Sequence, residues 1–558
     1  MSDQPSAPPP GRATRALLAF IVLFLGGSGL VYEYCLSTLA THLLGNSVEQ
    51  FSLIIALMMF AMGLAGLVQR RIGERAALAE VFIFVEIALG LIGGASAVGL
   101  YLAFAWMVHF RVVLYGLALL IGFGIGLEIP LLLRINARWR HDLKDNVGDI
   151  FSLDYIGALG GALLWAFLLL PTLSLDHISL LLGLANLGVA GVTLLLFHRQ
   201  VPRKGPVLAA LIGAIALLGG LTLNAPTLIE AARQRLYRDP IRYHAESVYQ
   251  DIVVTGRGDA IALYLNGQLQ FDSADEFIYH EMLVHPALLA LDRPPESVLV
   301  LGGGDGLAVR EVLRWPSVRR VMLVDLDPTI TAMARTWPPL VAQNGGSLAD
   351  ARVDVRPPAG VSPGPSAPVI KAAERPRDAL AGRRAVVAEV RLMHLDADLF
   401  VSEVPDTWDA IIADFPDPST PDLAKLFSLE FYQQVQNRLR PGGVLAVQSS
   451  SPYTTRAAFW AVRDTLEAAG FAVTSLHAHV PSFGEWGWHF ARPDGPAPTF
   501  TGAPPFPTRY VDEAALTAAA IFPRPLARPE GPPRVSTRLD PWIMRLYTAG
   551  EAAAQVGL

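Results

Sequence analysis

The chain has 558 residues, a net charge of −6, a single cysteine and a mean hydropathy of +0.39. This length predicts more than one domain, and a hydrophobic fraction of 52% excludes a chain that is soluble throughout. The acidic balance gives no reason to expect nucleic acid as a partner. Because Cys35 is alone, an intramolecular disulfide and a cysteine-rich zinc site are excluded.

Apolar segments make up most of the first 223 residues. Residues 1–14 are rich in proline and are expected to be disordered. Residues 15–223 are expected to form a transmembrane domain of about seven helices, because one span takes about 20 apolar residues. The pattern predicts a multi-pass protein of the cell (inner) membrane with the lipid bilayer as a partner. The expected spans are 15–41, 51–68, 78–102, 111–133, 150–170, 178–197 and 206–223.

Basic clusters fall on alternate loops between these spans, which places the N-terminus in the cytoplasm by the positive-inside tendency. Seven spans would then place the C-terminal half outside the cytoplasm. Arg233, Arg235 and Arg238 follow the last span and favour the cytoplasm instead. The charge pattern therefore leaves the side of the membrane open.

Four carboxylates lie within the expected spans, at Glu33, Glu86, Glu128 and Asp154. A carboxylate buried in a bilayer is costly, and this suggests a function such as contact with a cation. The plainer interpretation is a position near the interface or a hydrogen bond between helices. We favour the plainer interpretation, since polar pairs are common in membrane bundles.

From Asp239 onward the pattern changes to short strands and helices. Two β-rich runs separated by Gly-Arg-Gly-Asp predict a β-rich subdomain over residues 239–285, with a turn at Asn266-Gly267. Residues 286–558 alternate apolar runs with helical patterns, which predicts a Rossmann-like α/β domain with a mostly parallel sheet. Residues 357–384 are rich in proline, glycine and alanine and are expected to be a disordered insertion.

The most informative stretch is residues 298–327, VLVLGGGDGLAVREVLRWPSVRRVMLVDLD. It predicts a strand, a glycine turn containing Gly302 and Gly304, a helix, and a second strand ending at Asp325, which is the opening unit of a nucleotide-binding sheet. Asp305 does not suit a diphosphate, because an anion belongs on the free N–H groups of the helix start. A carboxylate in this turn suits a cationic ligand, such as a sulfonium nucleotide that carries an amine.

Four aspartates lie at or just after the ends of expected strands: Asp305, Asp325, Asp398 and Asp414. Ligands of parallel sheets bind at the carboxyl ends of the strands. Together these aspartates predict an acidic site suited to a polycation.

At these residues the C-terminal half resembles the spermidine synthases, the polyamine aminopropyltransferases, from about Tyr249 to Trp488. The motifs that carry the resemblance are LNGQLQFDSADEFIYHEMLVHPAL, LGGGDGLAVREVLRWPSV, LVDLDP and WDAIIADFPDP, in the order of the family. Combined with the apolar N-terminal half, they resemble the membrane-bound, multi-span bacterial branch of that family.

The resemblance implies transfer of the aminopropyl group of decarboxylated S-adenosylmethionine to putrescine or a related diamine. The products would be spermidine and methylthioadenosine. Decarboxylated S-adenosylmethionine would be a co-substrate, and no cofactor would be bound permanently. The region 239–285 would grip the substrate.

The resemblance also assigns candidate site residues in three groups. The catalytic residues would be Asp414 and Tyr279. The groups that bind the nucleotide would be Gly302, Gly304, Asp305, Asp325, Asp398 and Gln270. The groups that bind the polyamine would be Gln270, Tyr279, His280, Asp305 and Asp417.

Each aspartate has an implied task. Asp325 would accept hydrogen bonds from the ribose hydroxyls, and Asp398 would lie near the adenine amino group. Asp305 would bind the amine of the aminopropyl arm. Asp414 would take a proton from the attacking amine, and Asp417 would hold the far amine of the diamine.

The sequence departs from the family's pattern in the loop after Asp414, where Phe415-Pro416 replaces two serines, and at Phe483, where relatives often have tyrosine. These departures leave the preferred acceptor open. Two other functions stay open as well. One is an S-adenosylmethionine-dependent methyltransferase on the same fold, and the other is a non-catalytic membrane sensor or transporter of polyamines.

Three further expectations concern partners and surroundings. No metal is expected, because His280 and His285 are five residues apart and do not share a helix face. Trp486 and Trp488 are interpreted as packing residues. The soluble half is expected on the cytoplasmic side, where the family's substrates are made, and a homo-oligomer (dimer or tetramer) is left open.

Overall fold

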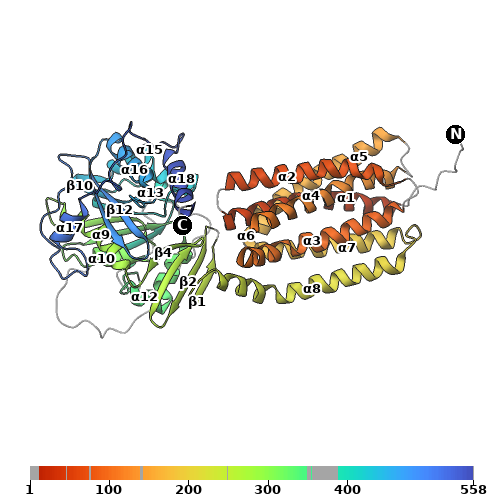
Figure 1. Ribbon diagram of the computed structural model, residues 1–558, viewed down its shortest axis with the longest axis horizontal. Coiled ribbons are helices and arrows are strands. Elements are labelled where there is room, and N and C mark those ends of the chain that lie inside the picture. Colours follow the sequence, from red (N-terminus) through yellow and green to blue (C-terminus); the bar gives the residue numbers. More distant parts are fainter. Residues whose placement is uncertain are drawn as a thin grey trace. The chain divides into compact units, whose positions relative to one another are not determined.

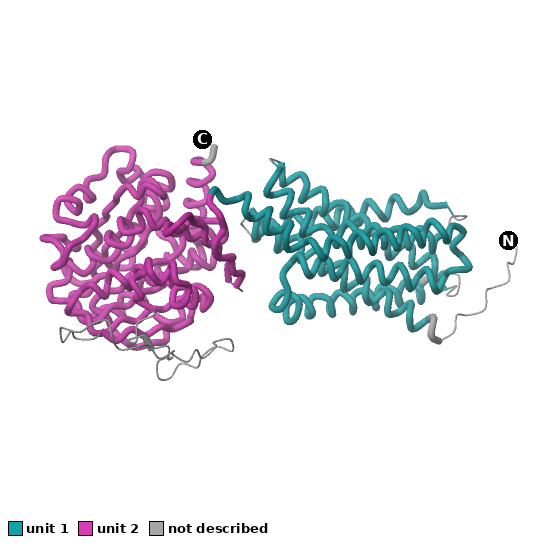
Figure 2. The backbone as a smooth tube through the Cα atoms, turned by 90° about the horizontal axis from the view of Figure 1, so that it is seen from below, with its two compact units in different colours: residues 1–238 teal, residues 239–558 magenta. Residues whose placement is uncertain are grey.

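The computed structural model describes residues 12–44, 47–73, 77–107, 109–137, 142–247, 249–348, 353–354 and 388–556. The chain divides into two compact units, Met1–Arg238 and Asp239–Leu558 (Figure 2). The expected insertion 357–384 and residues 1–11 of the expected disordered N-terminus lie outside the described residues.

The first unit is a bundle of long helices (Figure 1). Seven helical segments among the described residues are long and apolar enough to cross a membrane. A 3-10 turn, Gln69–Arg71, follows the second helix, and a π-helical turn, Trp165–Leu169, and α6 (Leu170–Thr172) continue the fifth. The long helices are α1 (Arg12–Leu44), α2 (Ser47–Val68), α3 (Leu78–Trp106), α4 (Phe110–Asn136), α5 (Leu143–Leu164), α7 (Leu175–Leu196) and α8 (Lys204–Arg235).

The first and last of these helices are longer than the apolar segments that predict them. Helix α1 begins at Arg12, inside the stretch 1–14 that was expected to be disordered, and α8 continues past residue 223 to Arg235. Hydropathy marks only the apolar part of a helix. The sequence IEAARQR at the end of α8 is polar but consists largely of good helix formers.

Glycines allow close contact between α1 and α5. A Cβ atom added to Gly157 would lie 1.9 Å from the carbonyl oxygen of Leu23, and one added to Gly161 would lie 2.5 Å from the carbonyl oxygen of Gly27. The two helices therefore approach backbone to backbone, which is the way small residues promote packing between membrane helices.

The four carboxylates that were expected within the spans differ in burial. Glu86 is 0% exposed and Glu128 is 2% exposed, and the two are close electrostatic neighbours. Glu33 and Asp154 are half-buried. Of the two interpretations of these residues, a contact between helices fits Glu86 and Glu128, because Glu86 belongs to α3 and Glu128 to α4.

The second unit begins with a four-stranded antiparallel sheet in the order β1-β2-β3-β4. Asn266 and Gly267 join β3 to β4 with φ angles of 50° and 78°, the left-handed conformations that an Asn-Gly hairpin turn requires. Helix α9 (Glu276–Leu289) follows. The strands are β1 (Ile241–Glu246), β2 (Asp251–Arg257), β3 (Ala260–Leu265) and β4 (Gln268–Asp272).

An eight-stranded sheet, in the order β11-β12-β10-β9-β5-β6-β8-β7, forms the centre of the second unit (Figure 1). Its six strands from β5 to β10 are parallel, as the alternating pattern predicts, and β11 and β12 form an antiparallel hairpin at one edge. The strands are β5 (Ser297–Gly302), β6 (Arg320–Asp325), β7 (Val353–Asp354), β8 (Glu389–His394), β9 (Trp408–Asp414), β10 (Leu439–Gln448), β11 (Ala472–Val480) and β12 (Gly484–Arg492).

Both faces of this sheet are covered. Val298 and Val300 belong to one hydrophobic cluster, while the alternating residues Leu299 and Leu301 belong to another. The helices that cover the faces and complete the unit are α10 (Leu307–Leu313), α11 (Pro328–Thr336), α12 (Pro338–Gln343), α13 (Ala397–Glu403), α14 (Pro421–Ala424), α15 (Leu429–Gln436), α16 (Arg456–Ala468), α17 (Glu513–Ala519) and α18 (Trp542–Val556).

The order of the strands reverses at β5. From there the chain builds β6, β8 and β7 on one side and β9 and β10 on the other. Such a switch point in a Rossmann-like sheet opens a crevice at the carboxyl ends of the two central strands. A ligand site is therefore expected where β5 and β9 end.

The close contact of α1 with α5 predicts that alanine lowers the stability of the protein at Gly157 but not at Gly160, which both belong to α5. We expect Gly157→Ala to lower the free energy of unfolding by about 1–3 kcal/mol, because its methyl group would overlap the backbone of α1. Gly160→Ala is the matched control, since no atom lies within 4 Å of its added Cβ, and it should be neutral or stabilising by up to about 1 kcal/mol. Thermal unfolding of the purified full chain measures both, and equal effects would contradict the packing.

Candidate functional site

Parallel pairing brings the carboxylates at the strand ends to one edge of the central sheet. Gly302 at the end of β5 lies in register with Asp414 at the end of β9. On the other side of β5, Asp325 at the end of β6 is in register with His394 of β8. The two aspartates therefore lie on either side of the glycine turn.

The turn is built from glycine because the backbone of Asp414 and the side chain of Asp325 lie against it. A Cβ atom on Gly302 would be 2.1 Å from the carbonyl oxygen of Asp414, and one on Gly304 would be 2.6 Å from Oδ2 of Asp325. Gly302, Gly303 and Gly306 also have positive φ angles. The N–H of Gly304 donates to Oδ2 of Asp325 at 2.9 Å.

Asp305 is half-buried in this turn, and its Oδ1 accepts the N–H of Leu307, the first residue of α10, at 2.9 Å. Burial raises the pKa of Asp305, while the nearby His280 lowers it. Burial also raises the pKa of Asp325 to about 7, although its Oδ1 accepts the N–H of Asp327 at 2.8 Å. Each of these carboxylates would be stabilised as an anion by a ligand that brings a positive charge or hydroxyl donors.

Tyr279 and Asp414 form the central pair of the site. The hydroxyl of Tyr279, from α9, donates to Oδ1 of Asp414 at 2.7 Å. Burial raises the pKa of Asp414 to about 6, His280 lowers it and Asp305 raises it. A buried carboxylate whose pKa lies near neutrality can accept a proton from a reacting group.

An aromatic wall surrounds the Tyr279 ring and consists of Phe483, Trp486 and Trp488. Their ring centroids lie 6.1, 6.4 and 5.8 Å from that of Tyr279. The indole N–H groups of both tryptophans are buried without a hydrogen-bond partner among the described residues. The interpretation of Trp486 and Trp488 as packing residues fits the structure, because Trp488 is 0% exposed within a hydrophobic cluster and Trp486 packs against that cluster.

His280 carries the positive charge nearest to this acidic edge. Its Nδ1 donates to Oε2 of Glu276 at 2.9 Å. Burial lowers the pKa of His280, but Glu276 raises it more, to about 9, so the ring is an imidazolium at neutral pH. Arg310 completes the network with hydrogen bonds of 2.8 and 2.9 Å to the carboxylate of Glu276. Sequence reasoning found His280 but missed Glu276 and Arg310.

Asp417 is half-buried after the end of β9 and accepts hydrogen bonds from two side chains. Ser450 donates at 2.5 Å and Gln448 at 3.3 Å. Ser450 holds its position with a φ angle of 61°, which is unusual for a residue other than glycine. Such strain is concentrated at functional sites.

Two predicted site residues have partners of their own. Gln270 is half-buried in β4, and its amide donates to the carbonyl oxygen of Gln268 at 3.2 Å, within its own strand. Asp398, in the first turn of α13, forms an ion pair with Arg538. Among the described residues, no hydrogen bond joins either one to the pair formed by Tyr279 and Asp414.

Asp396 is a neighbouring carboxylate that sequence reasoning passed over. It caps the start of α13 by accepting the N–H of Asp398 at 2.8 Å, and it forms an ion pair of 2.6 Å with Lys425. It follows the carboxyl end of β8 directly. Asp396 and Asp398 therefore both lie just past the carboxyl end of β8.

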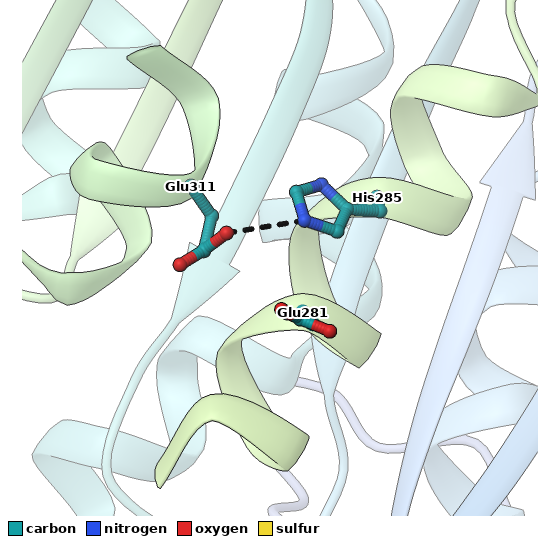
Figure 3. A group of neighbouring side chains, drawn as sticks. All are labelled: Glu281, His285 and Glu311. Atoms are coloured by element: carbon teal, nitrogen blue, oxygen red, sulfur yellow. Dashed lines mark ion pairs between the residues drawn. The ribbon is translucent and has the colours of Figure 1, made fainter. Parts of the chain in front are cut away.

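A second group of side chains, Glu281, His285 and Glu311, brings its ligand atoms within 4.8 Å of one another (Figure 3). Nε2 of His285 lies 3.1 Å from Glu311, and Nδ1 accepts the indole N–H of Trp315 at 3.2 Å. Arg314 lies 2.7 Å from the carboxylate of Glu311 and 3.3 Å from that of Glu281.

The partners of this group favour a structural role. The carboxylate of Glu281 accepts three consecutive backbone N–H groups, at residues 509–511, and so fixes the C-terminal segment to α9. Glu311 is paired with Arg310 as well as Arg314. With two arginines beside them the carboxylates are already neutralised, which disfavours a divalent cation there.

The fold and the acidic edge define a Rossmann-like nucleotide-binding domain that is suited to a cationic ligand. The family model for the spermine/spermidine synthase domain matches residues 276–362 and 384–497. The chain is 40% identical to polyamine aminopropyltransferase 1 of Streptomyces coelicolor, covering 98% of this chain and 97% of that protein. It is also 40% identical to the polyamine aminopropyltransferase of Mycobacterium tuberculosis, over 91% of each chain.

These similarities show that the chain belongs to the spermidine synthase family of polyamine aminopropyltransferases, as the motifs predicted. A solved structure of spermidine synthase with the transition-state analogue AdoDATO is similar with a TM-score of 0.41 and 23% identity. That match covers 51% of this chain and 85% of the other chain.

Proposed function

We propose that this protein is an aminopropyltransferase that transfers the aminopropyl group of decarboxylated S-adenosylmethionine to putrescine or a related diamine. Spermidine and methylthioadenosine are the products. The observation that supports the proposal most is the hydrogen-bonded pair of buried Tyr279 and half-buried Asp414, which lies against the glycine turn that carries Asp305. Membership of the aminopropyltransferase family points to the same chemistry.

The nucleotide is bound along the carboxyl edge of the sheet. The backbone of Gly302 and Gly304 leaves room for it, and Asp325 accepts hydrogen bonds from the ribose hydroxyls. Asp398 is the proposed partner of the adenine amino group, for which its ion pair with Arg538 must open or shift. Asp305 holds the ammonium of the aminopropyl arm, so an amino acid carboxylate at that end would be repelled.

The acceptor lies between the aromatic wall and the carboxylates. Phe483 and Trp486 are half-buried beside Tyr279, and aromatic rings of this kind favour an organic cation. Asp417 holds the far ammonium of the diamine, and His280 limits the excess of negative charge nearby. Gln270 is the proposed contact from the antiparallel sheet.

Asp414 prepares the attacking amine. An alkylamine has a pKa of about 10.4 and is protonated at neutral pH, so it must give up a proton before it can attack. The nitrogen lone pair then forms a bond to the methylene carbon next to sulfur. The bond from that carbon to sulfur breaks, its electron pair stays on sulfur, and the sulfonium becomes the thioether of methylthioadenosine. Tyr279 orients Asp414 for the proton transfer.

The test incubates the purified full chain with decarboxylated S-adenosylmethionine and a panel of diamines and measures methylthioadenosine. We expect turnover, and we expect Asp414→Asn to lower kcat by at least about 100-fold while decarboxylated S-adenosylmethionine still binds. Because Asp414 has a pKa of about 6 and acts as a carboxylate, kcat/KM should fall as the pH drops below about 6.

Two outcomes would overturn this proposal. One is the absence of methylthioadenosine with every diamine while S-adenosylmethionine yields S-adenosylhomocysteine, which would make the protein a methyltransferase. The other is full retention of function in Asp414→Asn, which would indicate a polyamine sensor or transporter.

We also propose that the seven apolar helices anchor the enzyme in the cell membrane, with the second unit in the cytoplasm. Their length and composition suit a bilayer, and the substrates of the reaction are cytoplasmic metabolites. The protein should stay in the membrane fraction after an alkaline carbonate wash, and trypsin added to intact spheroplasts should leave the second unit uncut. Release by carbonate would contradict the anchor, and digestion would contradict the orientation.

A further inference from the structure

A chain of buried ion pairs leads from α10 to His280. Arg310 donates from both of its terminal nitrogens to the carboxylate of Glu276, at 2.8 and 2.9 Å, which is the two-pronged geometry of strong arginine–carboxylate pairs. The same carboxylate accepts the Nδ1–H of His280 at 2.9 Å. Glu276 is 1% exposed and His280 is 2% exposed, so water screens these charges only weakly.

The end of α12 joins these ion pairs to the glycine turn. The amide of Gln343 donates to Oε1 of Glu276 at 2.8 Å, and its carbonyl oxygen accepts a hydrogen bond of 2.8 Å from Arg310. The next residue, Asn344, donates from its amide to the carbonyl oxygen of Asp305 at 2.9 Å. The carboxylate of Glu276 is therefore held by partners from α10, α12 and its own helix.

The hydrogen bonds of His280 fix where its protons lie. Its Nδ1 faces two acceptors, the carboxylate of Glu276 at 2.9 Å and the backbone carbonyl oxygen of the same residue at 2.8 Å. Nδ1 therefore carries a proton, and the second proton of the imidazolium lies on Nε2. Burial lowers the pKa of His280, but Glu276 raises it to about 9, so the positive charge is present at neutral pH and is lost as the pH rises through about 9.

This imidazolium lies beside the central pair. The rings of His280 and Tyr279 meet edge to face with their centroids 4.9 Å apart, and the hydroxyl of Tyr279 donates to Asp414 at 2.7 Å. Two charged groups act on Asp414: His280 lowers its pKa and Asp305 raises it. Without the charge of His280, only the repulsion from Asp305 would remain, and Asp414 would bind a proton more readily.

We propose that Glu276 and Arg310 are positioning residues that hold His280 as an imidazolium beside Tyr279, and that this charge keeps Asp414 in the carboxylate form that accepts a proton from the attacking amine. This inference rests on the proposed function, because it takes Asp414 as the proton acceptor. Glu276 and Arg310 act only through His280 and need no contact with either substrate.

The experiment measures kcat/KM for putrescine in the full chain between about pH 5.5 and about pH 9, since the acid limb of this profile reports the pKa of the base in the free enzyme. We expect Glu276→Gln to move the limb upward from about 6 by about one pH unit, because the amide no longer favours the second proton on His280. Relative to the wild type, kcat/KM should fall about fivefold at about pH 6 and less than about 1.5-fold at about pH 8.5. Putrescine titrates identically with both proteins, so its own protonation cancels in this ratio.

Glu311→Gln is the matched control. Glu311 is also a buried carboxylate and lies 2.8 Å from Arg310, but its histidine partner is His285, which belongs to the group in Figure 3. We expect this variant to lose stability as Glu276→Gln does and to leave the acid limb in place. Thermal unfolding measures the stability of both variants.

A double variant tests whether Glu276 acts through His280. His280→Gln removes the charge itself, so it should move the acid limb as far as Glu276→Gln does. The double variant should show no further shift, because the two residues serve one charge. His280→Gln also carries the test if Glu276→Gln does not fold, and an unmoved limb in that variant would contradict the inference.

The possible results separate this inference from the proposed function. If the wild type releases no methylthioadenosine with any diamine, the proposed function fails and the inference fails with it. If the wild type turns over putrescine but Glu276→Gln lowers kcat/KM equally at every pH, or leaves it unchanged, the inference is wrong and the proposed function stands. An equal shift in Glu311→Gln, or additive shifts in the double variant, would contradict it as well. A smaller amount of folded enzyme lowers activity at every pH and cannot imitate a shift of the limb.

Discussion

The desolvation of carboxylates at one edge of the central sheet is the constraint on which the site depends. Asp305, Asp325, Asp414 and Asp417 are half-buried there, and the partial loss of water around the carboxylates raises the pKa of each one. Burying an uncompensated charge costs several kcal/mol, so each carboxylate is held by donors from the chain and balanced in part by His280. A ligand that carries positive charge completes the balance, and this is why the edge suits a sulfonium nucleotide and a diamine.

The position of the carboxylates depends on the glycines of the turn. Without side chains at Gly302 and Gly304, the ends of β5, β6 and β9 can bring Asp325 and Asp414 against the turn itself. Because these glycines have no side chains, a nucleotide can also lie close along the backbone of the turn. Tyr279, supplied by α9, then fixes the orientation of Asp414 with one short hydrogen bond.

Local patterns were sufficient to predict the sheet, the glycine turn, the hairpin at Asn266-Gly267 and the long apolar helices, because each of these depends on residues close in sequence. The contacts that complete the site could not be predicted in this way. Arg310 reaches Glu276 across 34 residues, and Arg538 reaches Asp398 across 140. Only the folded sheet brings Trp486 and Trp488 to Tyr279, or Ser450 to Asp417, and no spacing in the chain signals these pairs.

The central claim is that the acidic edge recognises a cation at the aminopropyl end of the nucleotide. It is tested most directly by calorimetric binding of decarboxylated S-adenosylmethionine and S-adenosylmethionine to the wild type and to Asp305→Asn. The wild type should prefer the decarboxylated ligand by at least about tenfold, because the extra carboxylate of S-adenosylmethionine would face Asp305, and the variant should lose most of this preference. Equal binding of the two ligands by the wild type, or the same preference in the variant, would contradict the claim.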